Sequence, residues 1–190
     1  MEQAKKRDHK VMITDVAISK VPYIGIPGLS EEICRALHEE HKEILRIAQQ
    51  KNDSNEVLTV WDYAKDRKVR VLGSEHYVNP TTTPEAYGIF TSSSVYGLMY
   101  LHNHPSTNKF SFADITEFIR TPQIGLLSVV TNQGEVYVLM KSSAYSRHIA
   151  NDMRRKISHA YIVGIVDDKE AVELFLKNCF KGGVTYVKSH

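Results

Sequence analysis

Two histidines and an aspartate lie close together in the middle of this 190-residue sequence: His102, His104 and Asp114. Two imidazoles and one carboxylate are the ligand set of a zinc site that keeps one coordination position open. Zinc in such a site lowers the pKa of a water molecule to about 7, which makes hydroxide available at neutral pH. Such chemistry also needs a proton acceptor that is not itself a ligand. The residue types therefore predict a metal-assisted hydrolytic site.

Four glutamates could supply the proton acceptor. Glu56 opens a β-branched and aromatic run, and Glu75 follows the second apolar run of the same predicted hairpin. The position in the sequence does not decide between these two. Glu85 and Glu117 are weaker choices, because Glu85 belongs to a predicted surface helix and Glu117 lies three residues past Asp114.

The segment around the histidines predicts how they are positioned. Residues 95–104 read as a buried strand that Pro105 stops, so His102 and His104 would project from one face with Asn103 turned away. Ser111 would begin a helix that runs to about residue 120. Ser111-Phe112-Ala113-Asp114 is also a capping box, which alone explains Ser111 and Asp114 without a metal. The combination with His-Asn-His-Pro favours the metal site.

The other segments predict mixed α and β structure. We expect a strand over 11–18, helices over 30–51, 84–92, 144–158 and 168–180, and hairpins over 56–73 and 124–140. Residues 160–166 read as a strand or an apolar connector, and the tail from Gly182 as loose. His38 and His41 on the long helix are expected to face solvent. This order predicts an α+β fold with a mixed β-sheet flanked by helices. We expect a single domain over 1–190, with a core over about 30–140 and a C-terminal helical extension over about 144–180.

The composition limits the function classes. The chain is 42% hydrophobic and 24% charged with a formal net charge of +2, which is ordinary for a soluble globular protein. This balance indicates no general nucleic-acid or membrane role. The basic run Lys5-Lys6-Arg7, with Lys10, reads as a solvated tail. Cys34 and Cys179 read as buried free thiols. The sequence shows no signal peptide and no membrane-spanning run, so we expect a cytoplasmic location.

The motif resembles that of the JAB/MPN (JAMM) zinc metalloprotease superfamily, which includes deubiquitinating isopeptidases and the bacterial RadC proteins. The family pattern is a glutamate, a long gap, His-X-His-Pro, a loop and Ser-X-X-Asp. This chain has His102-Asn103-His104-Pro105 and Ser111-Phe112-Ala113-Asp114, and Glu56 lies 46 positions before His102. The matching region is roughly residues 30–140.

The resemblance implies a fold and a role for each residue. The fold would be the cytidine-deaminase-like α/β/α sandwich of this superfamily. His102, His104 and Asp114 would hold Zn²⁺, and Glu56 would move a proton from the attacking water to the leaving amine, with Glu75 as runner-up. Ser111 would hydrogen-bond the oxyanion. The substrate would be a protein or peptide, including ubiquitin-like conjugates, cleaved at a peptide or Lys isopeptide bond.

Two departures from the pattern bear on the subgroup. The loop 105–110 has six residues where many relatives have seven, and Thr107 replaces the glycine that follows Pro-Ser in RadC proteins. These differences argue against RadC itself and favour JAB-type domains of bacterial and phage proteins. Two other functions stay open: a zinc-binding scaffold without proteolytic activity, and a RadC-like DNA-associated protein. The near-neutral charge balance argues against nucleic acid as a partner.

Overall fold

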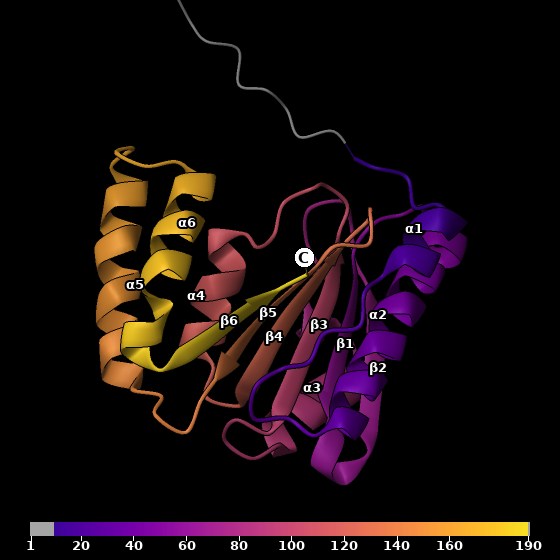
Figure 1. Ribbon diagram of the computed structural model, residues 1–190, viewed down its shortest axis with the longest axis horizontal. Helices are drawn as coiled ribbons and strands as arrows, with labels where there is room; N and C mark the ends of the chain where they lie inside the picture. The colour runs from indigo at the N-terminus through magenta and orange to yellow at the C-terminus, as the bar shows by residue number, and fades with distance from the viewer. Residues whose placement is uncertain (1–9, 190) are drawn as a thin grey trace, which may run out of the picture.

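A six-stranded mixed sheet forms the centre of the computed structural model, which describes residues 10–189 (Figure 1). The strand order is β2-β1-β3-β4-β5-β6. Every neighbouring pair is antiparallel except β3 and β4, which are parallel. The strands are β1 (Val57–Asp62), β2 (Arg67–Leu72), β3 (Leu98–His104), β4 (Ile124–Thr131), β5 (Val136–Lys141) and β6 (Val184–Lys188).

Helices cover both faces of this sheet, which confirms the predicted α+β sandwich (Figure 1). The helix α2 (Glu31–Lys51) lies on one face with α1 (Asp15–Lys20) beside it. The other face carries α3 (Pro84–Ser92), α4 (Phe112–Arg120), α5 (Arg147–Ile162) and α6 (Asp168–Asn178). Short 3-10 turns complete the described elements: η1 (Tyr63–Lys65), η2 (Pro80–Thr82) and η3 (Cys179–Gly182).

Strand alternation divides the buried side chains between the two faces. Leu101 packs with Leu37 and Ile44 of α2, whereas Tyr100 packs with Phe118 of α4 on the opposite face. The core that contains Tyr100 and Phe118 also includes Phe175 of α6, so the C-terminal helices share the core of the sheet. Since β3 and β4 are parallel, a crossover must connect them, and α4 is that connection. The end of β3 and the start of α4 therefore lie together at one edge of the sheet.

The strand predicted over 11–18 is wrong. Residues 10–14 are irregular and α1 begins at Asp15, because the Thr14 hydroxyl accepts a hydrogen bond from the Ala17 N–H and caps a short helix. The apolar residues of this segment still contribute to the core. Ile13 is buried against the α2 side of the sheet, and its N–H donates to the Ser54 hydroxyl at 3.1 Å.

The prediction that His41 faces solvent is also wrong, because His41 is buried between α2 and the sheet. Its Nε2 lies 2.7 Å from Ser128 Oγ of β4. Ser128 donates its own proton to the Tyr137 carbonyl, so His41 donates to Ser128. Burial lowers the pKa of His41 to about 4 and keeps its ring neutral. His38 is half-buried, and its Nε2 donates to the Val21 carbonyl.

The tail from Gly182 is ordered, contrary to the prediction. Residues Val184–Lys188 form β6, which pairs antiparallel with β5 at the end of the sheet. Gly183 has φ +72°, and an added Cβ would lie 2.4 Å from the Ala144 carbonyl oxygen, so this turn into β6 requires glycine. Residues 160–166, predicted as either a strand or an apolar connector, form a connector: α5 continues to Ile162 and a turn follows.

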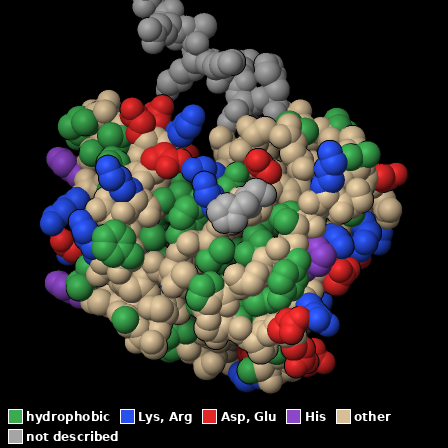
Figure 2. Space-filling model, in the orientation of Figure 1, with side chains coloured by type: hydrophobic (Ala, Val, Ile, Leu, Met, Phe, Trp, Pro, Cys, Tyr) green, Lys and Arg blue, Asp and Glu red, His purple; other side chains and the backbone are tan. Residues whose placement is uncertain are grey.

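Several smaller expectations had different outcomes. Cys34 and Cys179 are buried free thiols. The basic run Lys5-Lys6-Arg7 lies outside the described residues. Lys10 was expected to be solvated, but its side chain is largely buried and pairs with Asp53 at 2.8 Å. Among the helices of residues 10–189, none is both long and apolar enough to cross a membrane. Acidic and basic side chains are interspersed on the face shown in Figure 2.

Candidate metal centre

The two histidines lie side by side at the end of β3, as the strand parity predicted. The distance between His102 Nε2 and His104 Nε2 is 3.0 Å, and both side chains are buried. They project from the face covered by α3 and α4, where His102 stands opposite Leu58 of β1. Asn103 points to the other face and is fully buried.

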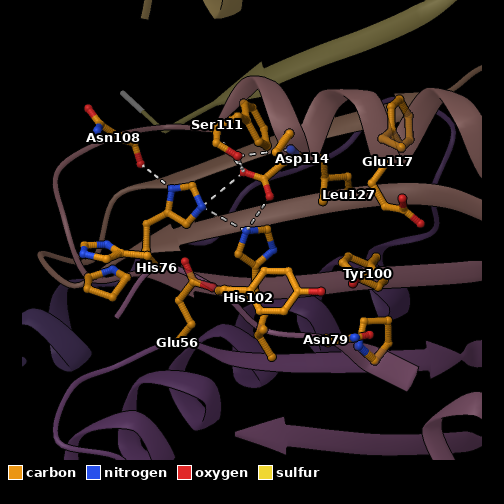
Figure 3. A pocket seen from close by; sticks show the side chains of 18 of the residues that line it. Glu56, His76, Asn79, Tyr100, His102, Asn108, Ser111, Asp114, Glu117 and Leu127 are labelled. Atoms are coloured by element: carbon orange, nitrogen blue, oxygen red, sulfur yellow. Dashed lines mark hydrogen bonds and ion pairs between the residues drawn. The ribbon is translucent and has the colours of Figure 1, made fainter. Parts of the chain in front are cut away.

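The first turn of α4 brings Asp114 onto the histidines (Figure 3). The capping box forms as predicted: the Ser111 hydroxyl accepts from the Asp114 N–H, and the Asp114 carboxylate accepts from the Ser111 N–H. Asp114 Oδ1 lies 3.5 Å from His102 Nε2, and Asp114 Oδ2 lies 3.2 Å from His104 Nε2. The same motif therefore caps the helix and positions a candidate metal ligand, because the cap itself directs the Asp114 carboxylate toward the imidazoles.

The spacing of these three groups fits a tetrahedral zinc ion. Zinc–nitrogen bonds of about 2.0–2.1 Å place neighbouring ligand atoms about 3.3 Å apart, the edge of a tetrahedron of that radius. The two Nε2 atoms are 3.0 Å apart, close to this edge, and each lies within 3.5 Å of a different Asp114 oxygen. Taking one ligand atom from each residue, all three lie within 4.8 Å of one another, so a small side-chain adjustment would bring them to this spacing. Among the described residues, only these three His, Cys, Asp or Glu side chains place their ligand atoms within reach of one ion.

The protonation of His104 also suits a metal ligand. Its Nδ1 lies 3.0 Å from the Asn108 carbonyl oxygen, and because a carbonyl only accepts, Nδ1 carries the proton. In the neutral ring, the lone pair is then on Nε2, the atom that faces His102 and Asp114. His102 Nδ1 is buried with no hydrogen-bond partner among the described residues. Two imidazole nitrogens and a carboxylate that converge in this way are ready to share a cation.

Without a metal, the three groups shift the pKa values of one another. Burial disfavours the charged form of His104, but the hydrogen bond and charge of Asp114 outweigh it and raise the pKa of His104. Burial also disfavours the Asp114 carboxylate, but His102 and His104 hold the pKa of Asp114 well below its usual range. The carboxylate is thus ionised at neutral pH, the form that binds metal.

Glu56 lies in the same pocket, just before β1. Leu58 pairs with His102, so continuing the antiparallel register by two residues on each strand places Glu56 opposite His104 on the same face. Figure 3 shows the Glu56 side chain pointing toward the histidines. Glu56 is 8% exposed, and burial raises the pKa of its carboxyl, an effect that His102 and His104 partly offset. A carboxylate of raised pKa is a better proton acceptor near neutral pH.

The other three glutamates differ in their positions. Glu75 lines the same pocket as Glu56, but its side chain is 42% exposed and lies 3.8 Å from His76. Glu117 also lines the pocket, one turn along α4 from Asp114, and accepts a hydrogen bond from the Thr121 hydroxyl. Glu85 is exposed on α3, outside this pocket. Burial and register favour Glu56 as the proton acceptor.

Ser111 is placed to orient Asp114. Its hydroxyl lies 2.7 Å from Asp114 Oδ2, so Ser111 donates to the carboxylate while accepting from the backbone. The predicted contact of Ser111 with an oxyanion would require its hydroxyl to rotate from Asp114 into the pocket. Ser111 lines that pocket, which makes the rotation a matter of one side-chain torsion.

A pocket of about 760 Å³ surrounds the site. Its volume is within the range of small-molecule and peptide sites. Besides the candidate ligands and several polar residues, its lining includes the apolar or aromatic side chains of Val78, Phe90, Tyr100, Phe110 and Leu127. Tyr100 precedes His102 by two residues on the same strand face and stands opposite Leu127 of β4. An apolar wall therefore begins directly beside the histidines.

Asn103 is a residue of the site that the sequence reasoning left without a role. Its Oδ1 accepts from the Val57 N–H at 2.7 Å, and its Nδ2 donates to the Asn55 carbonyl and to Asn132 Oδ1. These partners lie on both sides of Glu56 and at the end of β4. The signal was present, since a buried strand position rarely holds an asparagine unless it is hydrogen-bonded.

Comparisons with known proteins add nothing to this geometry. No protein-family model, curated protein or solved structure matches the chain. The function must therefore be argued from the site itself.

Proposed function

We propose that the protein is a zinc-dependent metallopeptidase or isopeptidase of the JAB/MPN type. One observation carries the proposal: Glu56, His102, His104 and Asp114 come from three separate segments and meet in one pocket. Their order along the chain and their motif resemble those of JAMM proteases. If these four residues only stabilised the fold, they would not need to border a pocket of this size.

His102, His104 and Asp114 would hold the zinc and leave one coordination position facing the pocket. The bound ion would polarise the scissile carbonyl and lower the pKa of the attacking water to about 7. Glu56 would accept a proton from that water and deliver it to the leaving amine nitrogen, so its carboxyl returns to the ionised state. Burial raises the pKa of the Glu56 carboxyl, which makes the carboxylate a stronger proton acceptor for such a shuttle.

The walls of the pocket suggest how a substrate chain would lie. The apolar side chains Tyr100 and Leu127 would contact the substrate next to the scissile bond. The carboxylates of Glu75 and Glu117 at the pocket would favour neutral or basic substrate residues. A reducing compartment such as the cytoplasm suits such an enzyme, because Cys34 and Cys179 are free.

The test compares the wild type with Glu56→Gln and Glu75→Gln on a panel of fluorogenic peptides and a Lys-linked ubiquitin conjugate. We expect Glu56→Gln to abolish cleavage while zinc stays bound, and Glu75→Gln to cleave as the wild type. If Glu75→Gln alone loses activity, the proton acceptor is Glu75. If zinc-loaded wild type cleaves none of these substrates, the protein is instead a zinc-binding scaffold without proteolytic activity.

A further inference from the structure

The C-terminal helices hold the segment that joins the two halves of the metal site. Phe112 N–H donates to Asp168 Oδ1 at 3.0 Å, and Lys109 Nζ pairs with Glu173 at 2.6 Å. The Phe112 ring also meets the Tyr161 ring, with centroids 5.8 Å apart. These three contacts attach residues 109–112, just before Asp114, to the end of α5 and to α6.

Asp168 satisfies a donor that α4 cannot satisfy alone. The first N–H groups of a helix have no partner within the helix. The capping box supplies partners for the N–H groups of Ser111 and Asp114, but Phe112 lies between them and needs another acceptor. The Asp168 carboxylate is that acceptor, and its negative charge suits the start of a helix.

The helix that carries Asp168 is itself firmly held. Phe175 and Ala171 of α6 are fully buried in the core that also contains Phe118 of α4. Asp167 and Glu170 form a capping box at the start of α6. Asp168 thus extends from a fixed element toward the first turn of α4, and it lines the metal-site pocket. Figure 1 shows α6 beside α4.

We propose that Asp168 is a positioning residue for the metal site: it fixes the first turn of α4 so that the Asp114 carboxylate stays against the two imidazoles. The proposal rests on the zinc-binding role proposed above, but not on hydrolysis. It makes the C-terminal helices part of the site, although the ligand motif ends 54 residues before Asp168.

Two measurements test this role: zinc affinity by competition with a chelator, and hydrogen exchange of the Phe112 amide in metal-free protein. Outer partners of metal sites typically contribute 10–100-fold in affinity, so we expect Asp168→Ala to weaken zinc binding about 10-fold. The Phe112 amide should also exchange at least about 10-fold faster, because its acceptor is lost. Asp168→Asn keeps an acceptor oxygen and should bind zinc within about 3-fold of the wild type.

Asp167→Ala is the matched control, since it removes the cap of α6 and leaves the Phe112 contact in place. It should change zinc affinity less than about 2-fold. If Asp168→Ala does not fold, Asp168→Ser replaces it, because the shorter hydroxyl falls short of the Phe112 N–H.

Unchanged zinc affinity and unchanged Phe112 exchange in the removal variant would overturn the proposal. Equal losses in Asp167→Ala and Asp168→Ala would also overturn it, because general loosening of α6 would then explain both. Should the wild type bind no zinc, the proposed function fails, while Phe112 exchange still decides whether Asp168 holds α4.

Discussion

Replacing Asn103 by alanine should destabilise the protein, although the Asn103 side chain is neither a predicted ligand nor part of the pocket lining. The change leaves the buried Val57 N–H and the buried Asn132 Oδ1 without their partners. An unsatisfied buried group costs about 1–3 kcal/mol, so two of them cost roughly 2–6 kcal/mol. We expect a loss of about 3 kcal/mol, since water can enter the space that alanine leaves.

Urea unfolding of metal-free protein measures this loss. For a chain of this size, 3 kcal/mol corresponds to a fall in Tm of about 6–12 °C. The control is Asn178→Ala, a half-buried asparagine whose side chain bonds to residues near its own helix end, and it should stay within about 0.5 kcal/mol. A loss below about 1 kcal/mol for Asn103→Ala would show that the network does not hold the ends of β1, β3 and β4 together.

Three further variants test other parts of the structure. Burial, aided by Arg147, lowers the pKa of Lys141 to about 7, so the unfolded chain binds more protons than the folded one between pH 7 and about 10.4. Stability should rise with pH over that window by up to about 1.4 kcal/mol per unit, and Lys141→Met should remove the slope; an unchanged slope refutes this. Phe175→Ala should cost about 3–5 kcal/mol in urea unfolding, because the side chain is fully buried in the core that α6 shares with α4, and a cost below about 1 kcal/mol would contradict that packing. Ser111→Ala should cost about 1 kcal/mol through the lost cap of α4 and also weaken zinc binding, whereas unchanged zinc affinity would separate Ser111 from Asp114.

The arrangement of the site follows from short-range rules that the sequence displays. Strand parity places His102 and His104 on one face, Pro105 ends the strand, and the capping box turns Asp114 back toward them. Each of these rules acts over a few residues. The position of Glu56 depends in addition on pairing between β1 and β3, which the order of elements suggested and the register provides.

The errors arose where distant segments decide the outcome. His41 falls between Leu37 and Ile44 on the apolar face of α2, a spacing that signalled burial but was outweighed by the general preference of histidine for the surface. The tail 184–188 becomes a strand only because β5 offers an open edge. Asp168 could not be identified from the sequence, since its contact with Phe112 requires the packing of α6 against α4. Residues 11–18 are the exception, because there a local cap prevailed over apolar alternation.

The most direct test of the central claim is the zinc content of the purified protein measured together with variants of the three ligands. The account predicts about one zinc per chain for the wild type and for Glu56→Gln. Zinc should be lost in His102→Ala, His104→Ala and Asp114→Ala, each folded by circular dichroism. A wild-type protein that binds no zinc at micromolar free metal, or ligand variants that bind it as tightly as the wild type, would contradict the account.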